Sequence, residues 1–455
     1  MLASGTMQDA TLVSSRSDRG ESRVAEGVTN AFNRDNVLAR LEGQPLWLAD
    51  LRRAAWDAYE AMPLPTTRLE EWRYTDPALL KWDQVGLAPL GGHVIDPARM
   101  DALFAGREAG CRVLVANGQI ANIELHPDLR ERGVVVKSIV EAALDHKALL
   151  SGYLGRIVPP ATGKFAALNG AFWSGGIFIH VPRGVRLDEP IRILRWIDQP
   201  GVAFFPRTLV VAGDGSHVSI IEEFASPDFE DPVFSCGVVE VDAASAADVQ
   251  YVALQQYGRG VHHLSTQRTV ARRDANLDTL VVNLGATVAR IDLGSSLDGP
   301  GSRSDLLGLY FARDGQHFDH ETRQDHKVPN ASSDLLYKGA LGDRSRAIFR
   351  GLIRVWPGAQ RTDAYQTNRN LILSRDAEAT SLPNLEIEAD DVRCSHAATV
   401  GQLDEEEMFY IMSRGIPRHE AERLVVFGFF DDVLDRLPLP GVVRELRQAV
   451  EARIG

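Results

Sequence analysis

The sequence predicts a mainly β protein, a parallel β-helix core flanked by helical regions at both ends. From about Gly155 to Val400, apolar and polar residues alternate in runs such as "TLVVAGDGSHVSIIEEF", which is typical of strands with one buried face. The turns in this region recur about every 25 to 31 residues, near positions 214, 243, 274 and 299. Such a loose repeat indicates the stacked coils of a solenoid. Before and after this region, apolar residues follow the spacing of helices.

The N-terminal part of the chain divides into a tail and a mixed region. Residues 1–34 are polar and lack the apolar core of a secretory signal, so we expect a disordered tail. Residues 35–154 form a helical and mixed region. There Leu48, Leu51, Ala55 and Tyr59 share one helix face, and short apolar runs such as "CRVLVANG" predict the first strands.

Residues 155–401 form the predicted β-helix core. A β-sandwich would show similar alternation, but its hairpins favour Asn-Gly or Asp-Gly turns. Asp-Gly occurs in this region only at Asp214, Asp298 and Asp314. Stacked coils need no such turns and no exact repeat, because only their inward apolar positions have to align. The pattern therefore favours the β-helix, with the sandwich as the alternative.

Residues 402–455 form a predicted C-terminal helical domain. The segment "DEEEMFYIMSRG" begins with acids, which complement a helix N-terminus, and ends in Arg414-Gly415. Pro417 then suits the first position of a second helix. The run "GVVRELRQAVEARI" predicts a last amphipathic helix after Pro440.

Composition limits the classes of partner. The chain has 49 Lys and Arg against 62 Asp and Glu, a net charge of -13, which argues against a nucleic-acid partner. No apolar run reaches the ~18 residues that a membrane span needs. Cys111, Cys236 and Cys394 are too few and too scattered for a secreted disulfide framework. We therefore expect a reducing, cytoplasmic location.

Motifs for catalysis are scarce. Near Gly163-Lys164 the chain has Val158 where a phosphate loop needs glycine and Phe165 where it needs serine or threonine, so we expect no bound nucleotide. The run "QHFDHETRQDH" holds three histidines that could ligate a metal. On one strand, however, residues at odd spacing point to opposite faces. This disfavours a closed site built from His317, His320 and His326.

Cys394 and His396 are the most suggestive pair. On a strand from about residue 391 to 399 they share a face and lie about 7 Å apart along the chain. They supply two ligands, whereas zinc or an iron-sulfur cluster takes about four. From the residues alone two interpretations stay open. The pair is either a buried thiol beside a hydrogen-bonded histidine, or half of a site that another chain completes.

The segment around this pair, "LEIEADDVRCSHAATVGQLDEEEMFYIMSRGI" at 385–416, closely resembles the hallmark segment of the SufB/SufD family of iron-sulfur cluster assembly scaffolds. Further similar stretches are "RLEEWRYTD" at 68–76, "ALNGAFWSGGIFIHVPRGVRLDEPI" at 167–191 and "GLIRVWPGAQRTDAYQTNRNLILSRDAEATSLP" at 351–383. The resemblance runs from about residue 36 to the end. The "EEWRYT" motif and the Cys-Ser-His triplet look most like the SufD branch, because SufB-type chains usually carry Cys-Glu-His-Glu there. SufD relatives commonly have glycine at Ala397.

The resemblance implies a right-handed parallel β-helix and a non-catalytic scaffold of the SUF system. Such a scaffold pairs with a SufB-like subunit through the β-helices and docks the SufC ATPase in a SufBCD complex. It implies that His396 lies at the SufB interface, where a transient iron-sulfur cluster is shared with the partner, and that no nucleotide binds this chain. Cys394 is a weaker candidate for the same site. Pairing of two copies of this chain is a further option.

The same resemblance places SufC on the C-terminal domain. Some large apolar residues there should belong to the domain core and the others should contact SufC; the candidates are Met408, Tyr410, Ile416, Leu424 and Phe429. The alternative is that all of them are core. Three other functions are kept as alternatives: a SufB-like scaffold that holds a cluster by itself, a β-helix carbohydrate-active enzyme, and a general interaction scaffold.

Overall fold

The computed structural model describes residues 31–89, 104, 107, 109–437 and 439–454. Of the tail predicted at 1–34, residues 1–30 lie outside the described residues. Phe32 is buried and Arg34 begins a helix, so the packed chain starts within the predicted tail.

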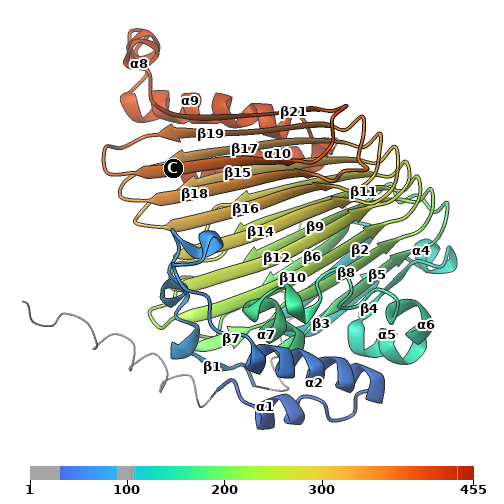
Figure 1. Cartoon of the computed structure of the whole chain (residues 1–455). Helices are drawn as coiled ribbons and strands as arrows, with labels where there is room; N and C mark the ends of the chain where they lie inside the picture. The colour runs from blue at the N-terminus through green and yellow to red at the C-terminus, as the bar shows by residue number, and fades with distance from the viewer. Residues whose placement is uncertain (1–30, 90–103, 105–106, 108, 438, 455) are drawn as a thin grey trace, which may run out of the picture.

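Two sheets form a β-solenoid of about eight turns, as the alternation predicts (Figure 1). Consecutive strands of the core alternate between the sheets, so the neighbours within a sheet are one coil apart and run parallel. Val233 pairs with Val261 and Ser332 with Asp363. A sandwich of hairpins would give antiparallel neighbours, which occur here only between β2 and β3 and between β4 and β5, among the described residues. The β-helix prediction is therefore confirmed.

Sheet A contains eleven strands of the described chain. They are β1 (Gly86–Leu87), β4 (Val135–Ser138), β5 (Ile177–Val181), β7 (Val202–Phe204), β8 (Arg207–Ala212), β10 (Val233–Ala243), β12 (Val261–Ala271), β14 (Val288–Leu297), β16 (His317–His326), β18 (Arg346–Val355) and β20 (Glu378–Ile387). Sheet B contains ten. They are β2 (Cys111–Ala116), β3 (Gln119–Leu125), β6 (Ile191–Trp196), β9 (His217–Ala225), β11 (Asp248–Gln256), β13 (Asn276–Asn283), β15 (Arg303–Ala312), β17 (Ser332–Leu341), β19 (Asp363–Ile372) and β21 (Arg393–Gln402).

The helices lie at the two ends of the described chain. The N-terminal ones are α1 (Arg34–Ala39), α2 (Leu46–Ala61), α4 (Pro127–Glu131), α5 (Ile139–Asp145), α6 (Lys147–Leu150) and α7 (Lys164–Phe172), with short 3-10 turns η2 (Glu70–Trp72), η3 (Pro77–Leu80), η4 (Trp82–Gln84) and η5 (Pro160–Thr162). The C-terminal ones are α8 (Glu405–Met412), α9 (Arg418–Leu434) and α10 (Pro440–Ile454). Among the described residues, none of these helices has the length and apolar character needed to cross a bilayer.

The space between the sheets holds the main hydrophobic core, and its tightest contact is a reciprocal glycine–tyrosine pair. Gly308 of β15 pairs with Tyr337 of β17, and Tyr310 of β15 pairs with Gly339 of β17. Each ring lies over the glycine of the neighbouring coil. A methyl group on Gly339 would lie 1.9 Å from Tyr310 Cε2, and one on Gly308 would lie 2.3 Å from the Tyr337 ring. Both glycines are therefore required by packing.

The N-terminal helices close the first coils. Helices α2 and α7 pack together around Trp56 and Phe172, whose rings meet edge to face with centroids 5.7 Å apart. Arg52 of α2 is buried and donates to the carbonyl oxygens of Ala171 and Trp173, at 3.1 and 3.0 Å. Burial lowers the pKa of Arg52 to about 9. These contacts fix the helical layer to the solenoid.

The C-terminal helices α9 and α10 lie on the outer face of sheet B rather than standing apart from it. The sheet supplies stacked leucines such as Leu280 and Leu307, and α9 supplies Val426 and Phe430. Ion pairs border this apolar contact, two of them with a buried cation and the third exposed. They join Lys338 to Asp432, Arg436 to Asp334, and Arg192 to Glu445. The helices are therefore part of the folded body.

We predict that Gly339→Ala lowers the free energy of unfolding by about 1–3 kcal/mol, the usual cost of overpacking a core, because the new methyl group must displace the Tyr310 ring. The matched control is Gly358→Ala, whose added methyl group meets nothing within 4 Å. Urea unfolding followed by circular dichroism measures both. Equal stability of the two variants would contradict the proposed packing role.

Candidate functional site

The solenoid ends at β20 and β21, the last strands of sheets A and B (Figure 1). Within the described chain, β20 pairs only with β18, and β21 pairs with no strand of sheet B except β19. Their outer edges therefore offer backbone N–H and C=O groups to a strand of another chain. Ile387 and Val400 are 42% and 47% exposed at this end. The open end therefore combines unpaired strand edges with two exposed apolar side chains.

Cys394 and His396 both lie on β21, which begins two residues later and ends three residues later than the strand predicted at about 391–399. The register places them over Ala364 and Gln366 of β19. Those two residues are buried between the sheets, so Cys394 and His396 share the inward face of the last coil. Cys394 is half-buried against an apolar cluster that includes Ala364 and Ala389. His396 is exposed, because no further coil covers it.

The environment favours His396 over Cys394 as a metal ligand. Partial burial raises the pKa of Cys394, and the nearby Asp363 carboxylate adds to this effect, so the thiolate that binds metals is disfavoured. His396 has no such cover. In the part of the chain that the structure describes, no three His, Cys, Asp or Glu side chains come together in a metal-binding group. These two side chains alone are too few ligands for an iron-sulfur cluster.

The other two cysteines lie in the hydrophobic interior. Cys111 and Cys236 are fully buried, and all three cysteines are free. Burial raises the pKa of Cys111 to about 12 and raises that of Cys236 further. The Cys236 thiol donates to the carbonyl oxygen of Phe165 at 3.4 Å. Both thiols are therefore structural.

The three histidines of β16 do not form a metal site, in agreement with the predicted strand geometry. His317 faces the outside of sheet A and bonds Thr75, while His320 and His326 face the core. The His320 ring stacks on Tyr310 with centroids 4.5 Å apart, and His326 Nε2 lies 2.7 Å from Ser333 Oγ. Burial lowers the pKa of both inner histidines to about 4.

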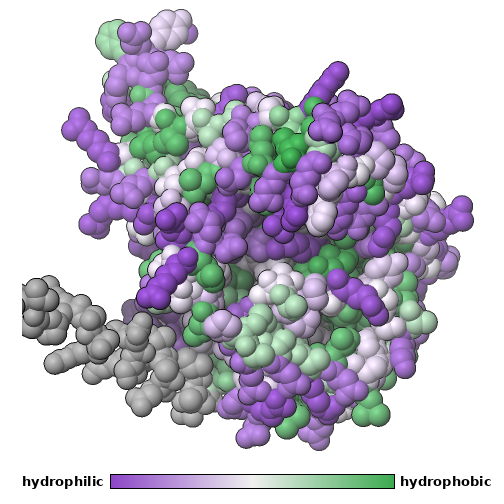
Figure 2. Space-filling model, in the orientation of Figure 1, coloured by the Kyte–Doolittle hydropathy of each residue, from purple (hydrophilic) through white to green (hydrophobic). Residues whose placement is uncertain are grey.

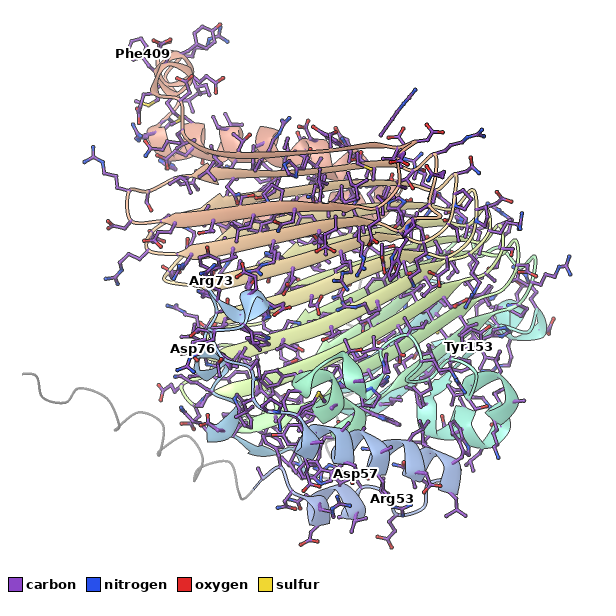
Figure 3. The ribbon with its side chains drawn as sticks, viewed as in Figure 1. Arg53, Asp57, Arg73, Asp76, Tyr153 and Phe409 are labelled. Atoms are coloured by element: carbon purple, nitrogen blue, oxygen red, sulfur yellow. The ribbon has the colours of Figure 1, made fainter. Side chains whose placement is uncertain are left out.

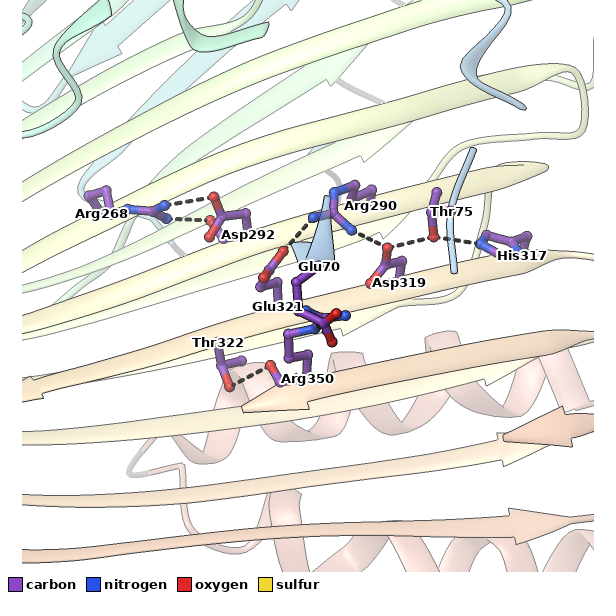
Figure 4. Close-up of polar contacts among 10 residues, drawn as sticks. All are labelled: Glu70, Thr75, Arg268, Arg290, Asp292, His317, Asp319, Glu321, Thr322 and Arg350. Carbon is purple, nitrogen blue, oxygen red and sulfur yellow. Dashed lines mark hydrogen bonds and ion pairs between the residues drawn. The ribbon is translucent and has the colours of Figure 1, made fainter. Parts of the chain in front are cut away.

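The motif "RLEEWRYTD" forms a strap, residues 68–76, across the outer face of sheet A (Figure 4). Thr75 Oγ1 donates to Asp319 at 2.5 Å and lies 2.9 Å from His317 Nε2. Since the single hydroxyl proton goes to Asp319, the imidazole N–H is the donor in the second bond. Glu70 lies 3.5 Å from Arg350 of β18, the neighbour of β20. The strap therefore reaches the coil next to the open end.

Arginine pairs on β14 and β12 extend this polar contact. The Arg290 guanidinium lies 4.3 Å from the centroid of the strap's Trp72 ring and forms ion pairs with Asp319 and Glu321. On the next strand, Arg268 pairs with Asp292 at 2.6 Å. The sequence patterns did not predict this network. The sequence feature that corresponds to the network is a run of charged residues at alternate, outward positions of β14, β16 and β18. The alternation pattern alone assigns these residues to solvent.

The five C-terminal candidates separate by exposure. Met408 is buried, and Ile416 and Phe429 are half-buried. Tyr410 and Leu424 are 59% and 49% exposed. Phe429 packs at the edge of the helix–sheet core, with Lys338 Nζ 4.7 Å from its ring centroid. Only part of the set is therefore free to meet a partner.

Phe409 is a surface residue that the sequence analysis did not name. Its side chain is 72% exposed on α8, which projects from the body beyond α9 (Figures 1 and 3). With Tyr410 it gives this short helix two aromatic residues in solvent. The sequence could have indicated this exposure, because the two residues that follow Met408 on a helix point away from the face that buries Met408.

Residues 195–429 match the family model described as "SUF system FeS cluster assembly, SufBD core domain". The chain belongs to the SufBD family. Residues 109–193 match the model of the SufBD protein N-terminal region. The SufBD core match thus covers the coils from β6 onward together with α8 and most of α9.

Relatives of this SufBD protein match along nearly the whole chain. An iron-sulfur cluster assembly SufBD family protein of Staphylococcus haemolyticus is 28% identical over 449 residues, 95% of each chain. One of Staphylococcus epidermidis is 28% identical over 434 residues, 92% of each chain. One of Staphylococcus aureus is 28% identical over 449 residues, again 95% of each. Iron-sulfur cluster assembly is therefore the family function of this chain.

We predict that acid destabilises the protein through its buried histidines. With a folded pKa near 4 and an unfolded pKa of about 6.5, His320 contributes stability above pH 6.5 that is lost as the pH falls towards 4. At about pH 5.5 the loss is about 1.4 kcal/mol for each such histidine. His320→Gln should reduce the difference between urea midpoints at pH 7.5 and 5.5. An unchanged difference would contradict this role.

Proposed function

We propose that this SufBD protein is a SufD-type, non-catalytic scaffold subunit of a SUF complex, which pairs with a SufB-like subunit and docks a SufC ATPase. The observation that carries the proposal is the incomplete ligand pair at the open end of the solenoid. His396 is exposed on the inward face of the last coil, beside unpaired strand edges. A second β-helix docked there would bring its own ligands to the imidazole.

A nascent iron-sulfur cluster would be held at such an interface until it is transferred. Imidazole nitrogen is a common iron ligand, and His396 would be this chain's contribution to a transient cluster held mainly by SufB. Cys394 lines the same face with its pKa raised, which suits a neighbour better than a ligand. The Cys-Ser-His triplet at 394–396 supports the SufD branch. Three free cysteines support a reducing, cytoplasmic location.

Two alternatives have weaker support. A SufB-like scaffold that holds a cluster alone would need a fuller ligand set, and the described residues bring no three ligating side chains together. A carbohydrate-active β-helix has no support from the family match, which assigns the core to iron-sulfur assembly. A pair of identical chains joined at β20 and β21 would use the same edges, and the partner subunit would compete with it.

The proposed pairing is tested in a complex reconstituted from this chain, a SufB-like subunit and a SufC-like ATPase. We expect His396→Ala to assemble normally, because the side chain is exposed, but to lower the iron and sulfide content after reconstitution to a small fraction. Ser395→Ala is the matched control, since Ser395 lies on the same strand and faces the other way. Wild-type cluster content in His396→Ala would contradict the assignment. Unchanged metal content in Cys394→Ser would leave Cys394 structural.

Hydrogen exchange on the same complex tests the edge contact. Residues 385–400 should gain protection when the SufB-like subunit is added, because backbone groups of β20 and β21 become paired. Protection confined to the C-terminal helices would refute pairing through the strand edges.

For SufC, we expect α8 and α9 to be the docking surface, with Tyr410 and Leu424 as the exposed members of the candidate set and Phe409 added to them. The phosphate-loop positions Val158 and Phe165 do not fit a nucleotide site, so ATP hydrolysis would act on this chain mechanically. The ion pairs from α9 to Lys338 and Asp334 of β17 would carry that motion into sheet B, two strands from the β21 strand that holds His396.

We predict that Phe409→Ser and Tyr410→Ser together abolish SufC binding, because interface hot spots are often aromatic and cost ~2 kcal/mol or more each, roughly 30-fold in Kd. Their exposure means that stability should change little. Leu144→Ser, at a 64% exposed position on α5, is the control. Binding is measured by isothermal titration calorimetry. Retained affinity in the double variant would move the docking surface elsewhere.

A further inference from the structure

A groove of about 380 Å³ lies on the outer face of sheet A, away from the open end. One wall is the turn after α6, including Tyr153 and Arg156. The other is formed by the C-terminal ends of β12, β14 and β16. Figure 2 shows hydrophilic side chains over much of the middle of the sheet A face. No step of the proposed function uses this groove.

The charge of the groove is opposite to that of the chain. Its lining has five cationic side chains and three carboxylates: Arg156, Arg268, Arg272, Arg323 and Lys327, and Asp242, Asp298 and Asp325. The whole chain has a net charge of -13. A local surplus of positive charge on an acidic protein indicates an anionic ligand.

The carboxylates in the groove already have partners. Arg272 grips Asp242 with two hydrogen bonds, at 3.0 and 2.6 Å. Lys327 lies 3.0 Å from Asp298. The Trp356 indole N–H donates to Asp325 at 2.6 Å. Asp242 and Asp298 are therefore neutralised by cations of the groove, whereas Asp325 has only a neutral donor and keeps its negative charge.

Of the arginines that line the groove, two have no carboxylate partner among the described residues, Arg156 and Arg323. Arg156 makes only a long hydrogen bond, 3.5 Å from Nε to the carbonyl oxygen of Ser151. Arg323 faces outward from β16 and is exposed. They stand on opposite walls of the groove.

A glycine on the floor of the groove makes room for the Arg268 side chain. Gly294 of β14 pairs with Arg268 on one side and Arg323 on the other. A methyl group at Gly294 would lie 2.8 Å from Arg268 Cδ and 3.0 Å from its Nε. The Arg268 side chain therefore crosses the glycine towards Arg323, held by Asp292. The groove thus places the guanidinium of Arg268, which is paired with Asp292, beside that of Arg323, which has no carboxylate partner.

We propose that this groove binds a small molecule bearing a phosphate group, with Arg323 and Arg156 as its main contacts. The planar fork of guanidinium donors matches phosphate oxygens in pairs. The volume exceeds that of a bare phosphate and lies within the range of small-molecule sites. Val270 and Ile157 in the lining offer apolar contact to an uncharged body.

The test uses the full-length protein and three probes: inorganic phosphate, adenosine 5′-monophosphate as a phosphate with a body, and adenosine without the phosphate. Isothermal titration calorimetry at low salt should detect both phosphates and not adenosine. Tighter binding of the nucleotide identifies an organic phosphate as the ligand class. Equal binding identifies the free ion. Absence of heat for both phosphates at millimolar concentration would overturn the proposal.

Matched charge variants locate the site. Arg323→Gln and Arg156→Gln should each weaken phosphate binding about tenfold, in line with the loss of one charge-assisted contact of ~1.5 kcal/mol. The control is Arg375→Gln, an exposed arginine in the turn before β20, outside the groove. Equal weakening by all three would show a general charge effect and reject the groove. Thermal melting without ligand checks that every variant is folded.

Discussion

Each strand of the solenoid satisfies its backbone N–H and C=O groups through the strands one coil before and one coil after it. This fixes the register of every coil, and register decides which side chains stack. It places Gly339 under Tyr310 and the leucines of sheet B in a row under α9. It also leaves the last coil with one neighbour only, among the described strands. His396 lies beside an unpaired strand edge as a direct result of that constraint.

Both outer faces of the solenoid are used, in different ways. Sheet B is covered by an apolar helix layer whose rim is sealed by ion pairs such as Lys338–Asp432. Sheet A is covered by the N-terminal helices at its first coils, where Phe165 of α7 packs against Phe234 of β10. Farther along, sheet A carries a polar surface, where Arg290 contacts two carboxylates and the strap. Apolar contacts stabilise through the area that they bury. Polar contacts fix orientation, because ion pairs depend strongly on geometry.

The sequence predicts what depends on short-range pattern. Alternation gave the strands and the coil repeat, and spacing placed Cys394 and His396 on one face of β21. Short-range pattern could not predict contacts between coils. The carboxylate partners of Arg290 lie about 30 residues away in the sequence, and only the register of the coils brings them together. Helical periodicity likewise marked α10 as amphipathic but did not reveal which of its faces meets sheet B. Phe409 was missed because its exposure depends on how α8 leaves the body.

The distribution of the thiols has a practical consequence. Cys111 and Cys236 are sealed in the interior, whereas Cys394 lies at the end of the solenoid. A maleimide dye added to the native protein would therefore label essentially one position, without any engineered cysteine. Because the pKa of the Cys394 thiol is raised, labelling requires a mildly alkaline buffer. A dye on Cys394 would thus be a single-site fluorescent reporter beside His396. Its emission would report the binding of another chain in real time.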